Sequence, residues 1–329
     1  MRALWQARRS ERRKLRANIA KAFAPAAISN FFAIHDEAVN PRDYSSFARV
    51  GATGGGFVLS RGVHTAATFV KGPSRRVEIT VNGVKNYPAR TTRRAVELLF
   101  KEGRERVGTG SLLLEQQVEV PIGQGFGASA ASALSAVMAA AAVVGIEEPV
   151  TRVAYAAHVA DIVSQTGLGT VSAIFERVGA GAITIPGAPG IAQFVQVKIP
   201  RGLKVVTASL APFAKSKLLD SAVLRRRANR LGEIALGRVK RTPTIGELAR
   251  SGEWFADELG LEVPELKALI KIARKEGALW ASQNMIGYSI HCVVKEGHVT
   301  KVVNGLSKSS LHPDVRTFDF GREKSRVLD

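Results

Sequence analysis

The chain has 329 residues, of which 46% are apolar, and a formal net charge of +19. This size and apolar content favour two domains, each with its own hydrophobic core. The one cysteine, Cys292, excludes an internal disulfide and a thiolate cluster, and favours a buried thiol in a reducing compartment. Residues 1–22 hold no hydrophobic signal segment, and no run elsewhere predicts a membrane span. We therefore expect a cytoplasmic protein without a membrane partner.

Much of the positive charge lies in a basic N-terminal tail, residues 1–22. It contains eight arginine and lysine residues against one glutamate, a net charge of +7. A solvated tail is the simplest interpretation, and contact with nucleic acid or another acidic partner is the alternative, although no base-stacking motif accompanies the charge. The positive charge in the rest of the chain favours a polyanionic ligand.

The first predicted elements after the tail are strands and one helix. The apolar pattern predicts strands at 28–34, 57–60, 64–70 and 76–81, then a helix over 91–101 and a strand that ends near Val118. Asn82-Gly83 predicts a hairpin turn after the fourth strand. An alanine-rich helix from about Ala128 and a helix over 151–163 follow.

The second half of the chain begins with strands and then becomes mostly helical. Strands are predicted at 182–185, 194–197 and 205–209, helices at 215–236, 245–259 and 264–276, and two last strands at 288–294 and 299–303. The Pro-Arg-Gly sequence at 200–202 predicts a boundary between domains 23–200 and 201–329. Runs of strands followed by runs of helices predict an α+β protein rather than a doubly wound sheet.

Three alternating glycines stand directly before the alanine-rich helix. Gly123, Gly125 and Gly127 let backbone N–H groups approach an anion without a Cβ in the way. A helix that starts near Ala128 adds its unpaired first-turn N–H groups and the positive end of its dipole. The hydroxyl of Ser129 would reach a phosphate oxygen or a phosphate-bound Mg²⁺. The segment therefore predicts a phosphate-binding loop.

Other interpretations of this loop are less well supported. A Walker-type loop requires a Gly-Lys-[Ser/Thr] sequence, which is absent here. A dinucleotide fingerprint fits formally from Gly123 to Ala128, with Glu147 about 20 residues further on. However, Pro121 separates the loop from a strand that alternates polar and apolar residues, and Glu147 stands before a helix. A simple turn before a core helix is the remaining alternative.

Residues 121–131, with the sequence P-I-G-Q-G-F-G-A-S-A-A, resemble the ATP-binding motif P-x-G-x-G-[LF]-G-S-S-A-A of the GHMP kinases. The resemblance implies ATP and Mg²⁺ as cofactors. It also implies a two-domain α+β fold, with an N-terminal domain like the second domain of ribosomal protein S5 and a ferredoxin-like C-terminal domain. The residues that it assigns to ATP are Pro121, Gly123, Gln124, Gly125, Phe126, Gly127, Ala128 and Ser129.

Four further blocks, in order along the chain, are similar to archaeal pantoate kinases. They are 24–34 with 51–63, 157–171, 186–190 (P-G-A-P-G) and 281–287. This resemblance implies ATP-dependent phosphorylation of pantoate to 4-phosphopantoate in coenzyme A biosynthesis, by a homodimer.

Several positions depart from the family pattern, mostly on the acceptor side. Thr170 stands where the family has an acidic residue, and Asp161 replaces a longer glutamate. The other departures are Ala26, Ala27 and Ala52, the first-serine position Ala128, and an arginine missing from 182–185. They leave two alternatives open: a kinase for another small hydroxy acid, and a catalytically silent nucleotide-binding homologue.

The resemblance and the residue types suggest roles for individual side chains. Ser129 and Asp161 offer the hard oxygen ligands that Mg²⁺ prefers, and we expect both on the metal-phosphate side. His158 lies three residues before Asp161, on the same helical face. There it would contact substrate, orient Asp161, or be a structural histidine with its hydrogen bonds satisfied. No dedicated base is evident.

The sequence offers two cations and two polar residues as candidates for the acceptor side. Arg61 or Lys215 would supply a cation for the substrate carboxylate, although surface cations are commonly only solvated. Ser282 and Asn284, in the last matched block, would line the substrate pocket or shape its turn.

Overall fold

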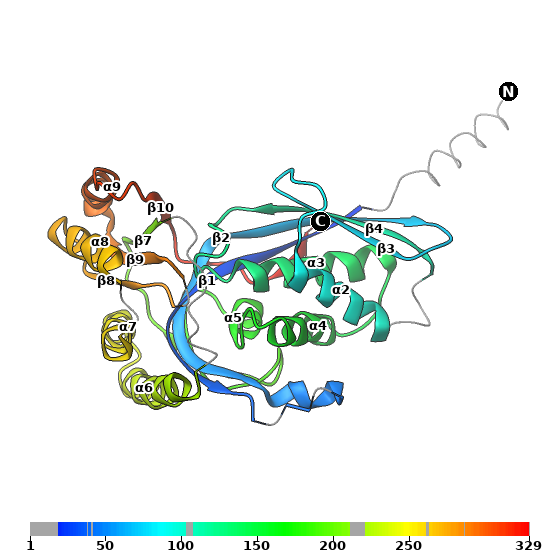
Figure 1. Ribbon diagram of the computed structural model, residues 1–329, viewed down its shortest axis with the longest axis horizontal. Helices are drawn as coiled ribbons and strands as arrows, with labels where there is room; N and C mark the ends of the chain where they lie inside the picture. The colour runs from blue at the N-terminus through cyan, green and yellow to red at the C-terminus, as the bar shows by residue number, and fades with distance from the viewer. Residues whose placement is uncertain are drawn as a thin grey trace.

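The computed structural model describes residues 19–328, except 38, 41, 103–107, 211–220, 261–262 and 286. Strands form a seven-stranded and a four-stranded sheet, one in each half of the molecule (Figure 1). None of the helices in the described part of the chain is long and apolar enough to cross a membrane.

Two long antiparallel strands form the centre of the larger sheet. Strands β1 (Ile19–His35) and β2 (Gly51–Lys71) pair along almost their whole length, so the strands predicted at 57–60 and 64–70 are one strand. The pairing with β1 continues between these two predicted strands because Gly62 has no side chain. A Cβ at Gly62 would lie 2.1 Å from the Ala24 carbonyl oxygen. Strand β1 begins within the segment expected to be a tail.

The remaining strands of this sheet extend it on both sides. Beside β2 lie β4 (Gly110–Val118) and then β3 (Arg76–Val81), which runs parallel to β4, while β5 (Ala180–Ile185) pairs with β2 and with β6 (Gln193–Val197). Asn82 and Gly83 form the predicted turn with positive φ angles of 48° and 82°. The turn does not connect two sheet strands as predicted, because the chain continues into a helix after one bridge between Val81 and Val84.

Four helices cover one face of this sheet: α2 (Arg90–Glu102), α3 (Ala128–Val144), α4 (Val150–Val163) and the unpredicted α5 (Thr170–Glu176) (Figure 1). Helix α3 lies in the middle and is buried on nearly all sides. Its alanines leave little side-chain volume, so β1, β2, α2 and α4 all pack closely on it. The buried Thr65 and Ser135 hydroxyls, 2.6 Å apart, satisfy each other between β2 and α3.

The smaller sheet contains β7 (Leu203–Ser209), β8 (Trp280–Gln283), β9 (Ser289–Lys295) and β10 (Asp314–Phe318), in the order β10-β7-β9-β8. Helices α8 (Pro264–Lys275) and α9 (Val299–Ser307) cover it and form a second core with it. The strand predicted at 299–303 was therefore wrong. The β-branched residues suggested a strand, but Val302 and Leu306, four residues apart, are both fully buried on one helical face.

Two helices connect the halves. Helices α6 (Ala222–Arg241) and α7 (Ile245–Leu259) pack against β1, and the last strand, β11 (Arg326–Leu328), pairs with the outer edge of β1. The contact of α6 with β1 is very close, because a Cβ at Gly232 would lie 2.0 Å from the Phe32 carbonyl oxygen. A short 3₁₀ helix, η1 (Tyr44–Arg49), was also not predicted. It lies in the connection that leads from β1 to β2 along the chain.

Candidate active site

The glycine loop has the backbone conformation that an anion site requires. Gly123, Gly125 and Gly127 have φ angles of 78°, 80° and 63°, a region that residues with a Cβ rarely adopt. Helix α3 begins at Ala128 as predicted, with Gly127 as its N-cap. Since Gly127 has no side chain and the first turn holds no carboxylate, the first N–H groups of α3 are left for an anion.

The C-terminal half holds this loop from behind. The Gln124 carbonyl accepts hydrogen bonds from Ser289 Oγ (2.6 Å) and Asn284 Nδ2 (3.3 Å). Asn284 Oδ1 in turn accepts one from His291 Nδ1 (2.9 Å), and burial lowers the pKa of His291 to about 3, which keeps the ring neutral. The conformation of the loop therefore depends on contacts between the two halves of the chain.

A cleft of about 630 Å³ opens beside the loop. Its walls come from the glycine loop, the second half of β1, the beginning of β2, the turn 165–169, the start of α5, and β5. Ser129 lines this cleft from the first turn of α3, as the sequence suggested. Thr170 also lines it, and its methyl carbon would lie 2.8 Å from a Cβ at Gly127. Thr170 is therefore next to the glycine loop.

Asp161 lies behind the turn 165–169 and not among the described residues that line the cleft. Its carboxylate is buried and accepts a 2.7 Å hydrogen bond from Thr166 Oγ1. Gly167 covers it, because a Cβ there would lie 2.4 Å from Asp161 Oδ2. The side chain thus holds a turn that lines the same cleft as Ser129, and its direct contact with a metal stays a prediction.

His158 also lies behind the cleft wall. Its Nε2 donates to the Phe47 carbonyl at 3.1 Å, and its ring stacks on Tyr155. Burial lowers the pKa of His158 to about 4, so the imidazole is neutral near pH 7. These contacts give it a packing role between α4 and η1.

The cations predicted for the substrate are elsewhere or outside the described residues. Arg61 is exposed and forms a 2.8 Å ion pair with Glu119, away from the residues described as lining the cleft. Lys215 belongs to the undescribed segment 211–220. Ser282 is buried in β8 and does not belong to the described lining; its neighbour Asn284 holds the glycine loop instead.

Two arginines that the sequence analysis missed line the cleft: Arg177 and Arg225. Arg225 Nη2 donates to both carboxylate oxygens of Asp36, at 2.6 and 2.7 Å. Arg177 lies with its guanidinium carbon 4.5 Å from the centre of the Phe194 ring. No sequence signal indicated Arg177, which lies between the matched blocks 157–171 and 186–190, and Arg225 stands in a run of three arginines that resembles surface charge.

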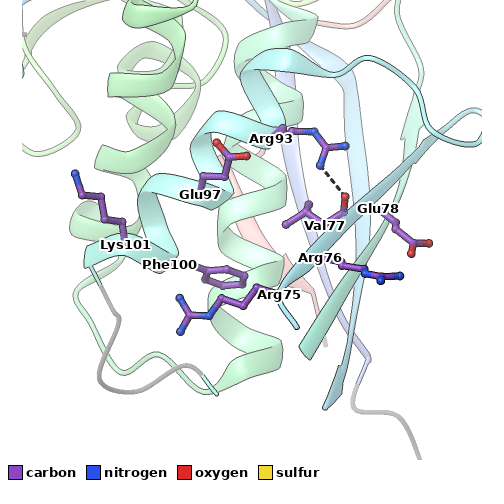
Figure 2. Close-up of a pocket in the computed structure, with 8 residues that line it drawn as sticks. All are labelled: Arg75, Arg76, Val77, Glu78, Arg93, Glu97, Phe100 and Lys101. Atoms are coloured by element: carbon purple, nitrogen blue, oxygen red, sulfur yellow. Dashed lines mark hydrogen bonds between the residues drawn. The ribbon is translucent and has the colours of Figure 1, made fainter. Parts of the chain in front are cut away.

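A second hollow, of about 620 Å³, lies between β3 and α2, and its described lining includes no residue of the glycine loop (Figure 2). Its charged side chains do not converge: Arg76 and Glu78 extend to one side in Figure 2, and Lys101 to the other. Arg93 is engaged with the Val77 carbonyl at 2.7 Å. This hollow therefore has the features of an open surface of mixed charge.

No family model matches the chain. Two curated pantoate kinases are similar to it over nearly their whole lengths. The protein of Thermococcus kodakarensis is 27% identical over 90% of this chain and 94% of its own, and that of Methanospirillum hungatei is 26% identical over 92% and 98%.

Solved structures of low sequence identity share the fold. A "phosphotransferase related to CoA biosynthesis pathway" superposes with a TM-score of 0.80 at 23% identity, over 94% of this chain and 98% of its own. The galactokinase of Lactococcus lactis, complexed with galactose, gives 0.67 at 14% identity, over 99% and 100%. The predicted α+β fold is confirmed: the chain is a homologue of these two curated pantoate kinases and shares the fold of the GHMP kinases.

Proposed function

We propose that this protein is a pantoate kinase, which transfers the γ-phosphoryl group of ATP to the terminal hydroxyl of pantoate and forms 4-phosphopantoate for coenzyme A biosynthesis. One observation carries the proposal: a glycine loop at the start of α3 opens directly onto a substrate-sized cleft. The similarity to curated pantoate kinases over nine-tenths of the chain supports the choice of acceptor.

The residues present fit an ATP phosphate chain and Mg²⁺. The left-handed glycines and the first turn of α3 offer N–H groups without a competing carboxylate. Mg²⁺ would neutralise charge on the β- and γ-phosphates. Ser129 would hold the metal-phosphate group from the cleft wall, and Asp161 would add negative charge from behind the turn 165–169.

Transfer forms a bond between the acceptor oxygen and the γ-phosphorus and breaks the bond to the bridging oxygen, so that ADP leaves. Such transfer depends mainly on alignment and charge stabilisation, so a dedicated base is not required. We assign alignment of the acceptor hydroxyl to Thr170, because its side chain lies beside Gly127. The apolar Phe31, Phe32 and Ile34 on the cleft wall suit the two methyl groups of pantoate.

The test uses the full chain with Mg-ATP and pantoate. We expect acceptor-dependent ADP release and 4-phosphopantoate as the product, identified by mass spectrometry and phosphorus NMR. ATP binding without pantoate-dependent ADP release would contradict the proposal. Turnover of another hydroxy acid would then favour a kinase with a different acceptor. Homodimer formation, an acidic partner for the tail and a cytoplasmic location stay predictions.

A further inference from the structure

We propose that Arg177 binds the carboxylate of the acceptor and thereby makes the cleft selective for hydroxy acids over neutral alcohols. The inference rests on the proposed function, because it assigns the acceptor end of the same cleft. It identifies a specificity-determining residue that the sequence pattern did not indicate.

The environment of Arg177 is that of a cation prepared for an anion. Its Nε is buried and has no hydrogen-bond partner among the described residues. The guanidinium lies 4.5 Å over the Phe194 ring, and both side chains line the cleft. Stacking fixes the plane of the guanidinium and leaves its N–H edge available for a bidentate carboxylate. A buried N–H without a partner is costly, and a carboxylate would satisfy it.

The position of Arg177 suits an acceptor that reaches from the phosphate loop. Helix α5 starts at Thr170, beside Gly127, and Arg177 follows its last residue. Seven residues of helix at 1.5 Å each place the two backbones about 10 Å apart. A short hydroxy acid together with an arginine side chain spans this interval. The hydroxyl then lies at the phosphate end while the carboxylate meets the guanidinium.

The other cations are less suited to this role. Arg225 also lines the cleft, but both of its short contacts go to Asp36, so its charge is already compensated. Arg61 is paired with Glu119 outside the described lining. Arg177 differs from both because no ion pair with another described residue compensates its charge.

The experiment compares two acceptors. Pantoate carries the carboxylate, whereas neopentyl glycol has the same hydroxymethyl and methyl groups without it. We expect Arg177→Gln to lower kcat/KM for pantoate by roughly 30- to 1,000-fold, as for truncation of one partner of a buried charge pair. The value for neopentyl glycol and the KM for ATP should change less than about threefold. Arg177→Lys should recover part of the pantoate activity, because it keeps the charge but loses the planar fork.

A matched control is available in Arg238, which stacks on Trp254 at 4.0 Å outside the described lining of the cleft. Arg238→Gln removes a similar stacked guanidinium and should leave the preference for pantoate unchanged. Thermal unfolding of each variant separates loss of fold from loss of selectivity. Equal losses for pantoate and the diol in Arg177→Gln, or a change in the KM for ATP alone, would overturn the inference. Loss of selectivity in Arg225→Gln but not in Arg177→Gln would assign the carboxylate to Arg225 and would also overturn the inference.

Binding measurements separate this inference from the proposed function. Calorimetric titration of pantoate, with a non-hydrolysable ATP analogue and Mg²⁺ present, does not require turnover. If the wild-type chain binds pantoate but forms no product, the proposed function fails, while weaker binding to Arg177→Gln still supports the inference. Absence of both binding and turnover overturns both.

Discussion

The substitution Gly125→Ala tests whether the C-terminal half shapes the nucleotide site. Gly125 and Gly123 both have left-handed backbones, with φ angles of 80° and 78°. A Cβ at Gly125 would lie 2.9 Å from Asn284 Cβ and 3.1 Å from the Met285 carbonyl oxygen. A Cβ at Gly123 would meet nothing within 4 Å. The two variants therefore share the backbone strain and differ in the contact with Asn284, Met285 and Gly287.

The expected magnitudes follow from these two contributions. Left-handed backbone costs an alanine about 1–2 kcal/mol, and forcing a methyl group into a packed site adds about 1–3 kcal/mol. If the free loop relaxes, ATP binding must restore its conformation, so these costs lower the affinity. We expect ATP affinity to fall by about 5- to 30-fold in Gly123→Ala, at 1.4 kcal/mol per factor of ten. For Gly125→Ala the same conversion gives a loss of about 30-fold to a few thousand-fold.

The assay is calorimetric titration with Mg-ATP, and thermal unfolding identifies any variant that has lost its fold. The informative quantity is the difference between the two alanine variants, since the strain common to both cancels. Equal affinities in the two variants, or a larger loss in Gly123→Ala, would refute the reasoning that Asn284, Met285 and Gly287 hold the loop in its binding conformation.

Three further predictions concern stability and catalysis. The pKa of His158 is about 4 in the folded protein against 6.5 for the ordinary side chain, so its stabilising effect is complete above pH 6.5 and is lost as the pH falls toward 4. The free energy of unfolding of the wild type should fall by about 3 kcal/mol more over this range than that of His158→Gln, measured by urea denaturation. Gly232→Ala should destabilise the protein by about 1–3 kcal/mol because it pushes α6 from Phe32. Gly237→Ala on the same helix should stabilise it by about 0.5–1 kcal/mol, because a Cβ there would meet only the end of the Arg241 side chain, at an ordinary contact distance of 3.6 Å; a destabilised Gly237→Ala would contradict this. Ser129→Ala should lower kcat by roughly 10- to 100-fold and retain the fold, since Ser129 faces the cleft; unchanged kcat would remove Ser129 from the metal-phosphate side.

Local properties explain which parts of the molecule were predictable. The glycine loop and the start of α3 depend on backbone freedom and helix propensity within a few residues, and the structure places both as expected. Helix α7 was predicted with its observed bounds, because its apolar spacing, its Thr244 cap and its terminal Gly260 are all local signals. The segment 299–303 was predicted wrongly, because burial of Val302 and Leu306 against distant elements overcame the strand preference of its valines.

The sequence by itself determined the glycine loop before α3, the α+β class and the relationship to pantoate kinases, since these depend on short patterns in a fixed order. Only the tertiary structure decided which charged groups reach the cleft. It places Arg177 on the wall, pairs Arg61 with Glu119, and covers Asp161 with Gly167. The physical reason is that a side chain's partners and exposure come from elements far apart in the chain, and residue type and spacing do not specify them.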